Sequence, residues 1–112
     1  MALTDQKEST EKGATGENVR IAVRTVGTDP HEAVRDLLES FPETAERLHR
    51  SDHVFIKINA VYFHPHLFTS PSLIAAAIDY IREHDPRKTI YLMDNCSQGN
   101  FTRLCFAATG ID

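Results

Sequence analysis

The chain has 112 residues, of which 41% are hydrophobic, and it carries a formal net charge of −4. This length is enough for one small domain, and the acidic balance argues against a surface for nucleic acid or an anionic membrane. No apolar run approaches the roughly 20 residues that span a bilayer, and the N-terminus lacks the apolar core of a secretory signal, so we expect a cytoplasmic protein with no membrane contact.

The first eighteen residues, Met1 to Asn18, are polar and show neither helical nor strand periodicity. Ordering them would cost conformational entropy without burying apolar surface, so we predict a disordered tail. Apolar and polar residues then alternate from Val19 to Val26. This alternation predicts the first strand of a single domain that occupies residues 19–112.

Two helices are predicted next. Asp29 offers an N-cap, Pro30 suits the first helical position, and Glu32 stands three residues after the cap in a variant of the capping box. Apolar residues follow at helical spacing until the Phe-Pro pair at positions 41 and 42 ends the helix. A short second helix is predicted from Glu43 to Arg50.

The centre of the chain has the layout of a strand, a helix and a second strand. The first strand, His53 to Val61, is apolar on both faces at its start and polar towards its end, which suits a sheet covered by helices on both sides. Ser70 and Pro71 are the N-cap and first residue of the helix, and Lys88 to Met93 form the second strand. A right-handed crossover makes these two strands parallel.

The predicted order is β-α-α-β-α-β-α, which indicates a three-layer α/β fold with a mostly parallel sheet of at least three strands. The three strands are residues 19–26, 53–61 and 88–93. A last helix carries an apolar face that includes Leu104 and Cys105 and ends near Gly110, with no strand after it. We therefore expect an incomplete domain, whose open sheet edge would favour self-association.

The carboxyl ends of parallel strands lie along one rim of the sheet, where open α/β folds bind ligands. Lys57 could hold an anion there as a point charge, and Asn59 could orient it. Asp94 follows the last strand and could act as a metal ligand or general base, which makes Lys57 and Asp94 the best candidates for catalysis. The next turn, with Ser97 and Asn100, could offer amides to an anion.

Each of these residues also has a purely structural interpretation. Lys57 could extend its ammonium to solvent, Asn59 could cap a turn, and Asp94 could bond its own backbone. Two further candidates, His64 and His66, would face one metal ion if the segment is a strand, whereas a polyproline conformation would separate them in solvent.

Two cysteines are too few and wrongly spaced for a disulfide framework or a CxxC metal knuckle, so both are expected to be reduced, and the chain has no iron–sulfur cysteine cluster. Cys96 has no activating base nearby in sequence, and Cys105 lies on the apolar face of the last helix, where we expect it in the core. The chain has no GxGxxG, GxxxxGK[ST] or GxSxG motif, which argues against a standard dehydrogenase, kinase or acyl-transfer enzyme.

Several short motifs occur in a characteristic order: Val-Phe-Ile-Lys-Ile-Asn at 54–59, Thr-Ser-Pro at 69–71, Asp94 followed by Gly99 and Thr102, and Thr-Gly at 109–110. In this order the chain resembles the N-terminal part of the family catalogued as domain of unknown function 362. The resemblance runs from about Val19 to Ile111, and Ile58 replaces the proline of the family pattern. The later motif of the family and the ferredoxin-like cysteine cluster of some members are absent. The resemblance implies a fold and a site location but no reaction.

These observations predict an α/β protein with an anion- or metal-binding rim at the carboxyl ends of its strands, whose partner would be a small anionic ligand. The residues do not decide whether the protein is an enzyme, and they specify no cofactor. The alternatives are a non-catalytic module that binds a metal or a partner through His64 and His66, or a fragment without independent activity.

Overall fold

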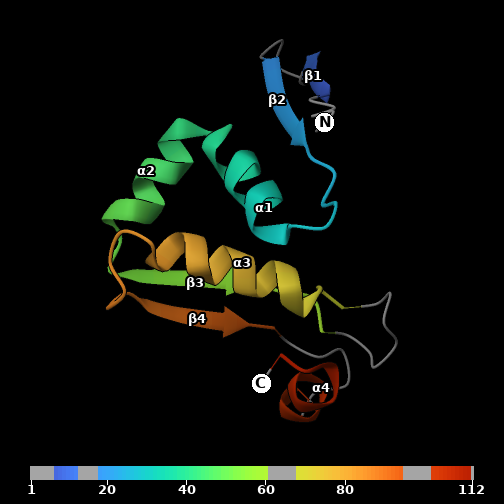
Figure 1. Ribbon diagram of the computed structural model, residues 1–112, viewed down its shortest axis with the longest axis vertical. Helices are drawn as coiled ribbons and strands as arrows, with labels where there is room; N and C mark the ends of the chain where they lie inside the picture. The colour runs from blue at the N-terminus through green and yellow to red at the C-terminus, as the bar shows by residue number, and fades with distance from the viewer. Residues whose placement is uncertain (1–6, 13–17, 61–67, 95–101, 112) are drawn as a thin grey trace.

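The computed structural model describes residues 7–12, 18–60, 68–94 and 102–111. Figure 1 shows the arrangement of the helices and strands in this part of the chain. In chain order they are β1 (Lys7–Lys12), β2 (Asn18–Val23), α1 (Pro30–Glu39), α2 (Pro42–Arg50), β3 (His53–Lys57), α3 (Pro71–Arg82), β4 (Thr89–Met93) and α4 (Thr102–Thr109). The fold is mixed α/β, as the sequence predicts, and its described strands form two separate two-stranded sheets.

The central strand–helix–strand unit is present. Strands β3 and β4 pair in parallel, in a register that aligns His53 with Thr89 and Lys57 with Met93. Helix α3 connects them and lies along one face of the pair (Figure 1). The Ile58 amide extends the ladder by donating to the Met93 carbonyl at 3.0 Å. The predicted parallel pairing is therefore confirmed for these two strands.

The strand predicted over residues 19–26 does not join this sheet in the described part of the chain. Strand β2 pairs antiparallel with β1, and Val19, Ile21 and Val23 on β2 remain 47%, 41% and 56% exposed. An alternating pattern predicts a strand but not its partner, and β1 satisfies the backbone of β2 without burying these side chains. Strand β1 lies inside the predicted disordered tail, so Lys7–Lys12 depart from that prediction; residues 1–6 and 13–17 lie outside the described part of the chain.

Helices α1 and α3 begin at the predicted Pro30 and Pro71, and α2 begins at Pro42, one residue before the predicted start. The Asp29 carboxylate accepts hydrogen bonds from the amides of His31 and Glu32, at 3.0 and 3.4 Å, and so caps α1. Each of the first three helices has proline in its first turn. Ser70 stands at the N-cap of α3, but its hydroxyl bonds the Ser72 hydroxyl at 2.8 Å and no amide. Gly110 follows α4 with a φ of 75°, which fits the predicted helix end.

Lys88 joins α2 to the start of β4. Lys88 is only 5% exposed, and its ammonium donates to the carbonyls of Leu48 and His49, both at 2.5 Å. These carbonyls belong to the last turn of α2, where backbone acceptors have no partner within the helix and a positive charge is favoured by the helix dipole. The sequence identifies Lys88 only as a strand residue, because its acceptors lie about 40 positions earlier.

The core lies on one face of the parallel sheet. Val54, Ile56 and Ile58 of the β3 segment pack against α3 and its neighbours, and α4 adds Cys105, which is 2% exposed and thus a core residue as predicted. The opposite face carries Phe55, Tyr91 and Met93, which are exposed. The core clusters join α1, α2 and α3 to this one face, and the described residues do not confirm the predicted three layers.

The one-sided core leads to a prediction about stability. Ile58→Ala removes a side chain that is 3% exposed and should lower the free energy of unfolding by about 2–4 kcal/mol. Met93→Ala, on the exposed face of the neighbouring strand, should lower it by less than about 1 kcal/mol. Urea unfolding of both variants tests this, and equal losses would show that the outer face is also buried in solution.

Candidate ligand site at the carboxyl ends of the strands

The parallel register brings two of the predicted residues together. Lys57 is the last residue of β3, and Asp94 directly follows Met93, the residue that pairs with Lys57. The Lys57 Nζ atom lies 2.6 Å from Asp94 Oδ1, and it also donates to the Ile58 carbonyl. The second carboxylate oxygen, Asp94 Oδ2, accepts a hydrogen bond from the Ala60 amide at 2.5 Å. An ion pair thus marks the carboxyl ends of the two strands.

The two partners differ sharply in exposure. The Asp94 side chain is 2% exposed, whereas the Lys57 side chain is 69% exposed. The carboxylate is therefore held inside the fold with both oxygens hydrogen-bonded, and the ammonium faces outwards. An ammonium has three donors, of which two go to Asp94 and Ile58. Within the described part of the chain the third donor has no partner, so Asp94 orients Lys57 and the ammonium is the charged group that this end of the sheet exposes.

Asn59 belongs to the same rim. The backbone amide of Asn59 donates to the Thr69 hydroxyl at 2.8 Å, and its backbone carbonyl accepts from the Thr69 backbone amide at 2.7 Å. An antiparallel bridge between Ala60 and Phe68 follows. These bonds fix the backbone beside Lys57 while Asn59 itself remains exposed. Sequence reasoning missed Thr69 as a support, because its motif was assigned only to the start of α3.

Other predicted site residues lie outside the described part of the chain. Cys96, for which the sequence predicts no binding role, also lies there. The site residues concerned are His64, His66, Ser97 and Asn100. Their assignment to metal or anion binding stays a prediction from sequence. Among residues 7–12, 18–60, 68–94 and 102–111, no group of three or more histidine, cysteine, aspartate or glutamate side chains could hold a metal ion.

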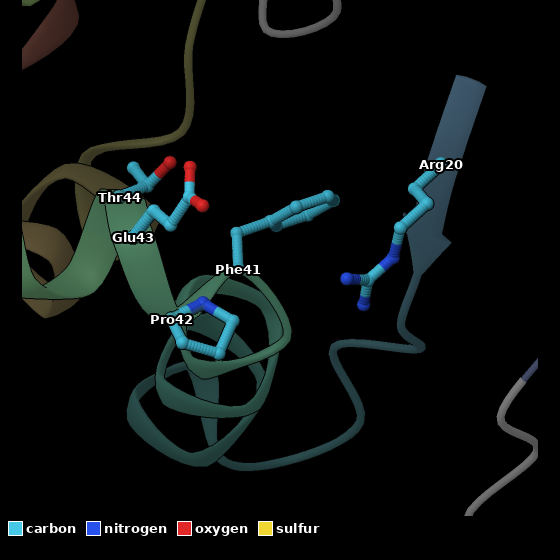
Figure 2. A pocket seen from close by; sticks show the side chains of 5 residues that line it. All are labelled: Arg20, Phe41, Pro42, Glu43 and Thr44. Carbon is cyan, nitrogen blue, oxygen red and sulfur yellow. The ribbon is translucent and has the colours of Figure 1, made fainter. Parts of the chain in front are cut away.

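A pocket of about 460 Å³ lies elsewhere, between β2 and the start of α2. It is lined by Arg20, Phe41, Pro42, Glu43 and Thr44. In Figure 2 the Arg20 guanidinium and the Phe41 ring project towards each other. The guanidinium carbon lies 5.6 Å from the ring centroid. Arg20 also donates to the Ser40 carbonyl at 2.9 Å and so attaches the hairpin to the helices. Because Arg20 and Glu43 bring opposite charges, the pocket favours neither anions nor cations.

A second group of titratable side chains joins α2 to the end of α3. The His49 and His84 rings stack with centroids 3.7 Å apart and an interplanar angle of 11°, and the Tyr80 ring lies 5.5 Å from His49. The His49 Nε2 atom and the Tyr80 hydroxyl oxygen are buried, and neither has a hydrogen-bond partner among the described residues. Burial lowers the pKa of His49, and the positive charges of His84 and Lys88 lower it further.

Comparison with protein-family models, with curated proteins and with solved structures found no match to the chain. Within the described residues, no helix is long and apolar enough to cross a membrane.

The partly buried His49 leads to a prediction about pH. Because its folded-state pKa is below the ordinary value of 6.5, the unfolded chain binds more protons between these two pKa values. The contribution of neutral His49 to stability is complete above about pH 6.5 and declines as the pH falls towards the folded-state pKa. Neighbouring Glu39 and Glu83 reduce this loss because they raise the pKa.

Urea unfolding at about pH 7.5 and pH 5 measures the effect. His49→Phe, which keeps an aromatic ring but cannot titrate, should lose less stability at the lower pH than the wild type. His31→Gln is the matched control, because His31 is an exposed histidine on α1 that pairs with Asp79. If His49→Phe shows the same pH dependence as the wild type, His49 is not the group that titrates.

Proposed function

We propose that the chain is a ligand-binding α/β domain whose site is the rim formed by Lys57, Asn59 and Asp94, and that its ligand is a small carboxylate or phosphate. The observation that carries this proposal is the asymmetric ion pair, in which Asp94 is buried and Lys57 is 69% exposed. The buried carboxylate holds the ammonium in place before a ligand arrives. Preorganised donors bind more tightly, because less conformational freedom is lost on binding.

The hydrogen bonds favour an anion over a metal ion at this position. Asp94 already uses both oxygens, and a metal ion would have to displace the Lys57 ammonium to reach one of them. Among the described residues Lys57 uses two of its three donors, and a charge-assisted hydrogen bond from the third to an anion is about twice as strong as a neutral one. The same bonding makes Asp94 an orienting residue in this proposal and not a general base, so the proposal is binding without an assigned reaction.

The motif order seen in the sequence supports the location of the site. In the resemblance to the domain of unknown function 362 family, Lys57, Asn59 and Asp94 occupy matching positions, and the resemblance implies a site at the ends of the strands. Ser97 and Asn100 remain part of the proposal as residues that would supply further donors to the anion.

Titration with inorganic phosphate, followed through the amide resonances of the protein, tests the proposal. The resonances of Ile58, Asn59 and Ala60 should shift saturably, and Lys57→Met should weaken binding about tenfold or more. One charged hydrogen bond of about 1.5–3 kcal/mol accounts for a change of that size. Sodium chloride at matched ionic strength serves as the screening control.

Arg87→Met is the matched control variant. Arg87 is also exposed and also paired with a carboxylate, that of Asp85 at 3.1 Å, but it precedes β4 and thus lies at the opposite end of the sheet. Binding should be unchanged in this variant. In the Lys57→Met variant the buried Asp94 carboxylate would lack the Lys57 ammonium. Adding Asp94→Asn removes that negative charge and checks that the loss of phosphate binding is not due to unfolding. Equal phosphate affinity in the Lys57→Met and Arg87→Met variants would refute the proposal.

A further inference from the structure

The face of the parallel sheet opposite α3 is apolar and exposed. Phe55 is 63% exposed, Tyr91 42% and Met93 49%, and all three alternate with residues that point into the core. The Phe55 and Tyr91 rings stack with centroids 4.7 Å apart and an interplanar angle of 12°, and the His53 ring lies 6.1 Å from Tyr91. We call this surface, formed by His53, Phe55, Tyr91 and Met93, the outer face.

Parallel sheets are almost always covered on both faces, because crossover connections place helices there. The helices α1, α2 and α3 lie on the inner side of the sheet (Figure 1). A stacked aromatic pair on the outer face is therefore an unusual exposure for a parallel sheet. It is the kind of apolar patch that marks an interaction site on a soluble protein.

The size of the outer face limits what can cover it. Two paired strands of five residues make a strip about 16 Å long and about 10 Å wide, which matches the diameter of one α-helix and about three helical turns. The exposed parts of its three large apolar side chains amount to on the order of 300 Å². A stable dimer needs about 800 Å² from each partner, so this area fits one helix better than a second copy of the chain.

The charge of the outer face limits the occupant further. Side chains two positions apart on a strand point to the same side. Lys57 therefore borders the outer face, beyond Phe55 and across from Met93. Its ammonium is exposed while the Asp94 carboxylate is buried, and an approaching molecule meets the positive partner first. An acidic side chain is therefore complementary to this end of the strip.

We propose that the outer face docks an amphipathic helix of a partner protein, about three turns long, with an apolar stripe over Phe55, Tyr91 and Met93 and an acidic residue opposite Lys57. As in other recognition of amphipathic helices, residues of the partner helix at positions i, i+3, i+4 and i+7 supply the anchors. The proposal extends beyond the anion site, because its apolar anchors play no part in binding phosphate.

A defined peptide serves as the probe. It has fourteen residues, with leucines at i, i+3, i+4 and i+7 and one glutamate at the end of the stripe, and a scrambled peptide of the same composition is its control. Calorimetry with the full chain should show saturable binding of the patterned peptide only. Phe55→Ser and Tyr91→Ser should each weaken it about tenfold or more, as expected for an aromatic anchor.

Leu104→Ser is the matched control variant, because Leu104 is an apolar side chain that is 54% exposed on α4 and is not one of the residues that form the outer face. Binding should be unchanged in it. A charge exchange tests the proposal independently of the aromatic variants. Lys57→Glu should weaken binding of the peptide that carries glutamate. A peptide with lysine in place of the glutamate should restore binding to that variant. Circular dichroism confirms that each variant is folded.

Three outcomes would overturn the proposal. Equal binding of the patterned and scrambled peptides would show unspecific adhesion. A concentration-dependent dimer in sedimentation that Phe55→Ser abolishes would assign the outer face to a second copy of the chain. Sedimentation of the wild type with vesicles of phosphatidylcholine and phosphatidylserine, abolished by the same substitution, would assign it to a lipid surface.

Discussion

The parallel pairing of β3 with β4 is the constraint on which the other features depend. Two parallel strands cannot be joined by a tight turn, so α3 has to cross over the sheet and covers one of its faces. The pairing also fixes the register that aligns Lys57 with Met93. A slip of one residue would turn Lys57 towards the core and separate it from Asp94. The ion pair at the rim is thus a consequence of strand register.

Strand β4 is anchored at both ends by charged side chains that are buried. Lys88, just before the strand, donates to two carbonyls at the end of α2, and Asp94, just after it, accepts from the Ala60 amide and from Lys57. Buried charges are costly unless they are hydrogen-bonded, and here both are bonded to backbone groups of other segments. A short strand of five residues thereby acquires a defined position between α2 and the segment after β3.

The sequence predicts local features of this fold well and long-range ones poorly. Asp29 and Gly110 act through their immediate neighbours, so both helix ends could be read from the chain. The alternation of Val19, Ile21 and Val23 predicts a strand but cannot distinguish a parallel partner from β1, and the charged Lys7–Lys12 segment carries no apolar pattern because its pairing needs none.

The rim was accessible to prediction for a physical reason. Strand polarity and crossover rules alone bring Lys57 and Asp94 to one end of the sheet, so no knowledge of side-chain conformation is required. Which partner is buried could not be predicted, because it depends on the Ala60 amide and on the bridge from Ala60 to Phe68. The coverage of the sheet was overestimated, since apolar residues on both faces of β3 predicted two helical layers.

The two proposals share one charged group. Phe55 and Lys57 lie on the same side of β3, so the outer face runs directly into the rim where the ammonium is exposed. The outer face offers a docked helix apolar contact area without charge, and Lys57 offers it a positive charge with little apolar area. An acidic helix docked on the strip would place its carboxylate where a free anion would bind. Thermodynamic linkage then makes a small anion and an acidic helix competitors for Lys57, each weakening the other by the same factor.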